Sequence, residues 1–269
     1  MSGFSADWLS RREPHDLRAR NPTVLDAVAA SFEQLSSVQV VDLACGTGST
    51  LRALGPFLPA QQNWKLIDND LGLLARAKAT PFAKHATVAA IALDLNRDLE
   101  AALDGPVDLV ATSALLDLVS EHWLDRLAVE IATRSIPLYA ALSYDGRIGL
   151  TPFDPLDAAI AAAVNAHQRT DKGFGPALGP AAAAFAIARF EALGYSVVHG
   201  ASDWAMGPDD IDIQTEILAG WASAAHDIGA LSLADTTAWL TRRRAAIAAG
   251  CSSLHVGHVD FFATPSATR

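Results

Sequence analysis

The chain has 269 residues, of which 51% are hydrophobic and 19% charged, and its 20 basic and 30 acidic side chains give a formal net charge of −10. A chain of this length and composition can bury a substantial core, and its profile is not that of a disordered protein. Nucleic-acid binding draws most of its affinity from basic groups that neutralise phosphates. The acidic balance therefore predicts no nucleic-acid partner.

Cysteine usage and the N-terminal segment bear on the cellular compartment. Cys45 and Cys251 are too few for a disulfide framework and fit a reducing environment. The segment MSGFSADWLSRREPHD has no apolar stretch of the kind found in signal peptides. The longest apolar runs are rich in Ala and are interrupted by Asp, Arg, His or Gly, so none supplies the ~20 apolar residues of a membrane span. We predict a soluble, cytoplasmic protein with no membrane association.

Short apolar runs alternate with helical segments over the first half of the chain. Runs that are apolar on both faces are typical of parallel strands covered by helices on both sides. The pattern predicts a three-layer α/β sandwich with a mostly parallel sheet, and the last two strands form an antiparallel hairpin at its edge. The predicted strands cover residues 38–44, 64–68, 87–95, 107–112, 137–144, 195–199 and 259–263.

Two segments fall outside this alternation. Residues 1–35 precede the first strand, and residues 151–190 follow the fifth strand with an Ala-rich helix and the turn-rich stretch TDKGFGPALGP. Phe174 and Leu178 would be poorly accommodated in solvent, which favours a packed loop over a disordered linker. We predict a single domain over residues 1–269, with lid helices in the first segment and a substrate-side lid in the second.

The stretch VVDLACGTGST places a tight turn directly after the first predicted strand. Gly46 and Gly48 permit positive φ angles and leave bare backbone for a ligand, although an ordinary strand–helix turn would carry the same residues. A nicotinamide-dinucleotide site requires a third glycine, and Leu51 stands there. The carboxylate of Asp42, in the strand before the turn, would repel a pyrophosphate but suits a cationic ligand.

This stretch resembles motif I of the class I S-adenosylmethionine-dependent methyltransferases, a family built on a seven-stranded Rossmann-like sheet. The resemblance covers roughly residues 38–145, and it implies that S-adenosylmethionine is the cofactor and S-adenosylhomocysteine the product. It places Asp42, Ala44, Gly46 and Gly48 at the cofactor. Many relatives carry Gly where this chain has Ala44, and Ala is the smallest alternative.

The resemblance extends to the end of the second strand. Relatives carry an acidic residue there that holds both ribose hydroxyls, and LIDND places Asp68 at that point with Asn69 beside it. A carboxylate suits a vicinal diol because its two oxygens accept from both hydroxyls. Asp70 lies past the strand end, and we expect it to begin the next helix.

In relatives, the third strand ends in a polar side chain near the adenine amino group. The sequence IALDLN places Asp94 at this point, with Leu95 able to pack on the adenine ring. A helix N-cap is the alternative role for Asp94, and Asn96 competes for it.

The end of the fourth strand separates subclasses of the family. Relatives that methylate nucleic acids carry an Asn/Asp-Pro-Pro-aromatic motif or a Pro-Cys pair there, and the sequence ATSALLD carries neither. Together with the acidic charge, this indicates a small-molecule acceptor. Ser113 is predicted to lie at the cofactor, and Asp117 is either a site residue or a solvated residue at a helix start.

Candidate general bases follow the fifth strand. Tyr144 and Asp145 come at its predicted end, and His167 lies in a polar, glycine-rich stretch typical of a lid. Arg169 and Lys172 in the same stretch would bind an acidic group on the acceptor, or they are simply solvated cations.

The N-terminal segment supplies candidates for a cover over the cofactor, as in many relatives. Trp8, Arg12 and Arg20 are the candidates, and we select Arg20 to face the methionine carboxylate. Trp204 is either part of the acceptor pocket or core. We expect no metal site, because no acid or thiol cluster completes the pair formed by His255 and His258.

The function predicted from the sequence is methyl transfer from S-adenosylmethionine to a small molecule, in a protein that can form a homodimer. The acceptor atom, whether oxygen, nitrogen, sulfur or carbon, stays open. An alternative is a non-catalytic protein that binds the cofactor or its product and acts through protein association. A nicotinamide-dependent oxidoreductase is a further alternative.

Overall fold

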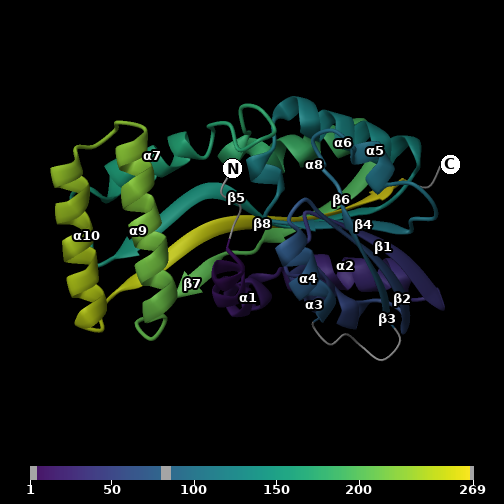
Figure 1. Ribbon diagram of the computed structural model, residues 1–269, viewed down its shortest axis with the longest axis horizontal. Helices are drawn as coiled ribbons and strands as arrows, with labels where there is room; N and C mark the ends of the chain where they lie inside the picture. The colour runs from purple at the N-terminus through teal and green to yellow at the C-terminus, as the bar shows by residue number, and fades with distance from the viewer. Residues whose placement is uncertain (1–4, 80–85, 267–269) are drawn as a thin grey trace.

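The computed structural model describes residues 5–79 and 86–266, and these residues build one mixed sheet (Figure 1). Its strands run in the order β3-β2-β1-β4-β5-β8-β6. The first five are mutually parallel, and β8 pairs antiparallel with both β5 and β6. The strands are β1 (Ser37–Leu43), β2 (Gln61–Asp68), β3 (Ala86–Ala92), β4 (Leu109–Ser113), β5 (Leu138–Thr151), β6 (Tyr195–Ala201), β7 (Trp204–Met206) and β8 (Ser253–Pro265).

This architecture confirms the predicted fold class. All seven predicted strands form, and the antiparallel edge consists of β6 and β8 as expected. Within the described residues one further strand is present, because the short β7 pairs with β8. β8 also begins at Ser253, earlier than predicted, so the edge is longer than the sequence indicated.

The helices cover both faces of the sheet and one end of it. Alternation along β1 explains the two faces, since Val38 and Val40 pack into one core cluster and Val41 and Leu43 into the other. The helices are α1 (Ala6–Ala19), α2 (Pro22–Phe32), α3 (Ser49–Leu54), α4 (Leu71–Ala79), α5 (Leu99–Ala102), α6 (Glu121–Thr133), α7 (Asp157–His167), α8 (Ala182–Ala192), α9 (Ile211–Asp227) and α10 (Leu233–Ala248).

The core clusters show which helices cover each face of the sheet. Buried residues of α2, α3 and α4 belong to the cluster on one face, and those of α5, α6 and α8 to the cluster on the other. A third cluster joins α7, α9 and α10 to the far ends of β5 and β8. Figure 1 shows α9 and α10 side by side at the end of the molecule that is opposite β3.

Parts of the two segments predicted as lids pack into the helical layers. Within residues 1–35, α2 belongs to a helical layer, because Val28 and Phe32 are buried in the core. Within residues 151–190, α8 is likewise a layer helix with Phe190 at its centre. The parts of the two segments outside the layers on the two faces of the sheet are α1, α7 and the loop between α7 and α8, and a lid role for them stays a prediction. Across residues 5–79 and 86–266, no helix combines the length and apolarity needed to span a membrane.

Candidate functional site

The turn between β1 and α3 has the backbone that the glycines predicted. Ala44, Gly46 and Gly48 adopt φ angles of 54°, 54° and 80°, in the left-handed region. A β-carbon at position 46 would lie 3.1 Å from Cδ1 of Leu9 on α1, so the turn and α1 are in close contact. Because β1, β2, β3 and β4 are parallel, their carboxyl ends meet at this same edge of the sheet.

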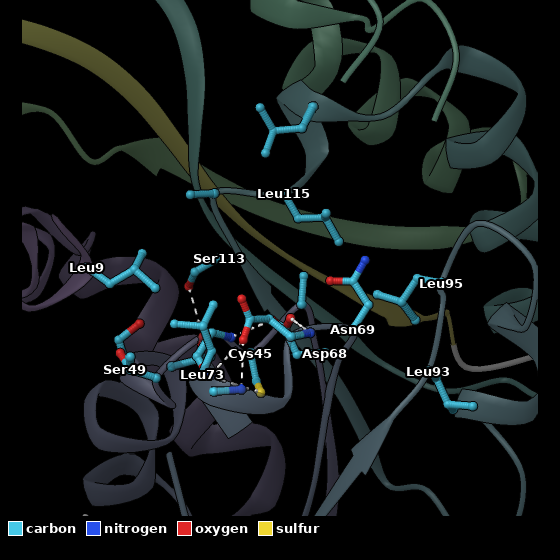
Figure 2. Close-up of a pocket in the computed structure, with 18 of the residues that line it drawn as sticks. Leu9, Cys45, Ser49, Asp68, Asn69, Leu73, Leu93, Leu95, Ser113 and Leu115 are labelled. Carbon is cyan, nitrogen blue, oxygen red and sulfur yellow. Dashed lines mark hydrogen bonds between the residues drawn. The ribbon is translucent and has the colours of Figure 1, made fainter. Parts of the chain in front are cut away.

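A cavity of about 610 Å³ opens at this edge, within the size range of small-molecule sites. Figure 2 shows Leu9, Leu115 and Leu95 on different sides of this space, with Asp68 and Asn69 between them. Of the residues predicted to bind cofactor, those that line the cavity are Ala44, Gly46, Asp68, Asn69, Asp94, Leu95 and Ser113.

The carboxylate of Asp68 is fixed by backbone donors. Its Oδ2 accepts from the amide of Gly46 at 2.9 Å, and its Oδ1 accepts from the amide of Asp70 at 2.9 Å. The side chain therefore joins the end of β2 to the turn after β1. Each carboxylate oxygen has a second lone pair, so the anchored group can still accept from a ligand hydroxyl.

Asp70 has the helix-capping role that the sequence indicated. Its Oδ1 accepts from the amides of Gly72 at 2.7 Å and Leu73 at 3.0 Å, in the first turn of α4. The two neighbouring acids thus divide their roles, with Asp68 fixing the turn and Asp70 starting the helix.

Asp94 is not the N-cap of α5, because Asp98 holds that position. Oδ1 of Asp94 accepts from the amide of Asn96 at 3.0 Å, which is a local turn contact. Its other oxygen accepts no hydrogen bond within the described residues, and the residue lines the cavity together with Leu93 and Leu95. The arrangement leaves one carboxylate oxygen and an apolar wall for a ligand.

Ser113, at the end of β4, contacts the turn region through Thr50. The Thr50 hydroxyl donates to Oγ of Ser113 at 3.2 Å, and both residues line the cavity (Figure 2). Thr50 was not singled out from the sequence, although its place in the first turn of the helix that follows the glycine loop was a usable signal.

Asp42 and Gly48 were predicted at the cofactor, but neither lines the cavity. Asp42 is fully buried, and among the described residues no donor reaches either of its carboxylate oxygens with good hydrogen-bond geometry, although the side chain of Thr50 lies close enough to lower its pKa. Burial raises its pKa to about 8, and the nearby Arg20 opposes that rise. Asp42 precedes the end of β1 by one residue, which places it beneath the turn. Gly48 instead occupies the N-cap position of α3.

Arg20 also lies outside the cavity, which corrects its predicted position. Its guanidinium is buried and donates from Nη1 to the hydroxyl of Tyr139 at 3.0 Å. The carboxyl groups of Asp42 and Asp260 also lie close enough to act on it electrostatically. Arg20, at the end of α1, therefore lies on the buried side of the helix and contacts the sheet through Tyr139.

Arg12 lines the cavity instead. Its Nε donates to Asp16 Oδ2 at 2.9 Å, and its guanidinium carbon lies 5.0 Å from the centre of the Trp204 ring. Trp204 donates in turn to Asp16 Oδ1 at 3.0 Å, so it fastens the lid and does not line the cavity. The sequence held the signal, since Leu9, Arg12 and Asp16 repeat at helical spacing on one face.

The three candidate catalytic residues lie outside the cavity lining. The hydroxyl of Tyr144 donates to Asn165 Oδ1 at 2.7 Å, and Asp145 accepts from Arg147 Nε at 2.6 Å. Both were expected at a strand end, but β5 continues to Thr151, which places them within the strand. His167, at the end of α7, contacts Lys172.

Residues of the two lids and of β4 complete the cavity. Lys172 and Phe174 line it from the loop between α7 and α8, whereas Arg169 is bound to the carbonyl of Asn165 and does not line it. Asp117 is buried with one oxygen unpartnered, and burial raises its pKa to about 6, but it is not a lining residue either.

The sheet order is that of the Rossmann-like methyltransferase fold. Among solved structures, a cyclopropane-fatty-acyl-phospholipid synthase-like protein from Lactobacillus casei ATCC 334 has this fold, with a TM-score of 0.53 and 14% identity over 97% of this chain and 94% of that chain. At this identity the likeness is one of fold.

Two further structures are similar at lower scores. A SAM-dependent methyltransferase from Geobacter sulfurreducens in complex with S-adenosyl-L-homocysteine gives a TM-score of 0.46 at 18% identity, over 98% of this chain and 100% of that chain. The cyclopropane synthase MmaA2 from Mycobacterium tuberculosis gives 0.49 at 11% identity, over 96% and 94%. No family model matches the sequence, and the search of curated proteins found no match.

Proposed function

We propose that this protein is an S-adenosylmethionine-dependent methyltransferase that acts on a small molecule. The observation that supports this most is the pair of anchored carboxylates, Asp68 and Asp94, at successive strand ends around one cavity. Both keep acceptor capacity beyond their backbone contacts. Hydroxyl and amino donors of an adenine nucleoside match that capacity, whereas a pyrophosphate does not.

The residues present fit each part of S-adenosylmethionine. Asp68 would accept from the ribose hydroxyls and the second oxygen of Asp94 from the adenine amino group, with Leu95 against the ring. The positive φ angles of the turn around Gly46 leave bare backbone for the methionine end. Arg12, which takes the position first assigned to Arg20, would face the methionine carboxylate, because its Nη1 has no partner within the described residues.

When bound, the cofactor supplies a methyl group on a sulfonium sulfur, which a nucleophile takes while the bonding electron pair stays with sulfur. The contribution of this chain is alignment and exclusion of water. Leu9, Leu115 and Phe174 close the cavity from three elements. Tyr144, Asp145 and His167 lie outside the lining, so we assign none of them a proton transfer. Proximity alone can lower such a barrier by several kcal/mol, roughly 7–11 in well-oriented reactions.

Calorimetry with S-adenosylmethionine and S-adenosylhomocysteine tests the binding part. Replacing Asp68 by Ala removes a charge-assisted hydrogen bond of about 1.5–3 kcal/mol, so both ligands should bind roughly 10- to 100-fold more weakly. Asp26→Asn, an exposed change on α2, is the matched control and should bind as the wild type does. Absence of heat with both ligands in the wild type would refute the proposal.

Turnover is tested separately, by following S-adenosylhomocysteine release over a panel of small acids, amines, thiols and phenols. Release with any member supports an enzyme. Tight binding of both ligands with no release across the panel would favour the non-catalytic alternative.

A further inference from the structure

Lys172 lies in the cavity wall, and within residues 5–79 and 86–266 it forms no ion pair with a carboxylate. Its Nζ lies 3.0 Å from Thr170 Oγ1 and 3.4 Å from His167 Nδ1, and both partners are neutral acceptors. An ammonium group has three donors, so one remains for a ligand. Arg12, the other cation that lines the cavity, is already paired with Asp16.

The surroundings of Lys172 favour an anion as the partner of its remaining ammonium donor. Partial burial alone lowers the pKa of Lys172, which means that its charge has lost hydration without gaining a counter-ion. Burial and the neighbouring ammonium both lower the pKa of His167 and outweigh the carboxylate of Asp227, which raises it, so the imidazole stays neutral and its Nδ1 accepts. An anion bound here would supply the counter-ion that the partly desolvated ammonium group lacks.

The loop that carries Lys172 is fixed beside the end of β3. Asn96 donates from its side chain to the carbonyl of Gly173 at 3.1 Å, and Phe174 packs edge-on against Trp123 with ring centres 5.3 Å apart. Trp123 in turn donates to the carbonyl of Leu95 at 2.8 Å. Lys172 is thus anchored near the adenine end that the proposed function assigns to Asp94. The methionine carboxylate belongs at the opposite end, under α1.

The other residues that line the cavity indicate the polarity and the net charge of the ligand. Leu115, Leu118 and Phe174 line the cavity and present apolar surface. Three acids, Asp68, Asp70 and Asp94, also line it, and they would repel a dianion. One unpaired cation among several acids matches a single negative charge, which is a carboxylate and not a phosphate.

We propose that the methyl acceptor is a small carboxylic acid with an apolar body, that its carboxylate pairs with Lys172, and that His167 and Thr170 are positioning residues for that lysine. This inference rests on the proposed function. It replaces the catalytic role first predicted for His167 with an indirect one.

Binding of matched probes to the protein saturated with S-adenosylhomocysteine tests the inference. The probes are 3-phenylpropanoate, its neutral amide and phenyl phosphate, with affinities from ligand-observed NMR. The carboxylate should bind at least about tenfold more tightly than the amide, and Lys172→Met should abolish that preference while leaving the amide unchanged. Lys78→Met, an exposed change on α4, is the control and should keep the preference.

The positioning role of His167 has its own test. His167→Leu should weaken carboxylate binding several-fold, and His167→Asn should restore it, because the Asn side chain can again offer an acceptor to the lysine. Amide binding should not change in either variant. Equal loss in both variants would overturn the positioning role.

Other outcomes would overturn the assignment of the acceptor. These are equal affinity for carboxylate and amide, tighter binding of phenyl phosphate, or no binding of any probe. If Lys172→Met weakened S-adenosylhomocysteine instead of the acid, the lysine would bind the cofactor carboxylate, and the proposed function would stand without this inference. Failure of the wild type to bind S-adenosylhomocysteine would instead refute the proposed function itself.

Discussion

The two halves of the cavity are built in different ways. In the half formed by strand ends, the carboxylates of Asp68 and Asp94 are anchored by backbone amides of neighbouring turns. In the half formed by the lids, Arg12 and Lys172 are held by side chains, such as Asp16 and His167. Backbone anchors depend on the fold alone, whereas side-chain anchors depend on particular residues. Single substitutions should therefore affect the two halves differently.

The largest effect is expected at the anchor of α1. Asp16→Leu leaves Arg12 buried without its carboxylate and Trp204 Nε1 without its acceptor. Breaking a buried pair in this way costs about 3 kcal/mol or more. Urea unfolding should show this loss, and the double variant Arg12→Met/Asp16→Leu should recover part of it.

An exposed ion pair provides the control for that experiment. Arg189 and Asp125 form a pair whose side chains are 33% and 44% exposed. Asp125→Ala should cost less than about 1 kcal/mol. A loss for Asp16→Leu no larger than that of this control would contradict a side-chain anchor for the lid.

The second effect is expected in the turn of the backbone-anchored half. Gly46→Ala places a β-carbon where φ is 54° and Leu9 Cδ1 is 3.1 Å away, so it strains the turn and pushes against α1. Gly105→Ala carries comparable strain at a φ of 86°, but with no neighbour within 4 Å. Both should lose about 1–2 kcal/mol of stability. Only Gly46→Ala should also weaken S-adenosylhomocysteine binding, by about tenfold or more, in calorimetry.

Equal binding by these two variants would mean that contact between Leu9 and the turn does not shape the cavity. The comparison of the two halves would then lose its main structural link, because this contact joins α1 to the strand ends.

The sequence predicted the strand-end half well, since apolar runs ending in Asp or Gly locate strand ends. Asp68, Asp94 and Ser113 reach the cavity for that reason. The predictions of site residues were wrong where burial or the length of a strand determines whether a side chain reaches the cavity. Nothing local shows that Asp42 lies under the turn, or that β5 continues through the residues after Tyr144.

The lids were harder to predict because their positions depend on partners distant in sequence. Arg12 and Arg20 are on one helical segment, and choosing between them requires knowing which face of α1 meets the cavity. Trp204 determines that face through its bond to Asp16, 188 positions away in the chain. Likewise, the position of the loop against Asn96 is needed to see that Lys172 reaches the cavity and Arg169 does not.

The third effect concerns Asp42 and pH. Burial raises its pKa from an ordinary value of 3.8 to about 8 in the folded protein. Between these values the folded state holds a proton that the unfolded state has released, so this group makes stability fall as pH rises from about 4 to 8. Asp42→Asn cannot ionise, so its stability relative to that of the wild type should rise between pH 4 and pH 8.

Thermal unfolding at pH 5 and pH 8 measures this difference. The melting temperature of the variant relative to that of the wild type should rise between the two values, by about 2–4 °C for each kcal/mol. Asp117 and Asp260 also titrate, but they are unchanged in the variant and their effect largely cancels in the difference. A constant difference across this range would show that Asp42 ionises normally.

The smallest effect is expected at Ala44, and it tests whether the turn between β1 and α3 depends on the side chain at this position. Ala44 adopts a φ of 54°, which costs a non-glycine residue about 1 kcal/mol. Ala44→Gly removes that strain but adds flexibility to the unfolded chain, so the net gain should be below about 1 kcal/mol. We expect the shape of the turn, and not the methyl group of Ala44, to matter for binding, so calorimetry should give an unchanged affinity for S-adenosylhomocysteine. Ala114→Gly, at a φ of 51° beside the acceptor half, should show a similar gain in stability. Ala114 also lines the cavity. A loss of cofactor affinity in Ala44→Gly would mean that the β-carbon of Ala44, and not the shape of the turn, contributes to binding.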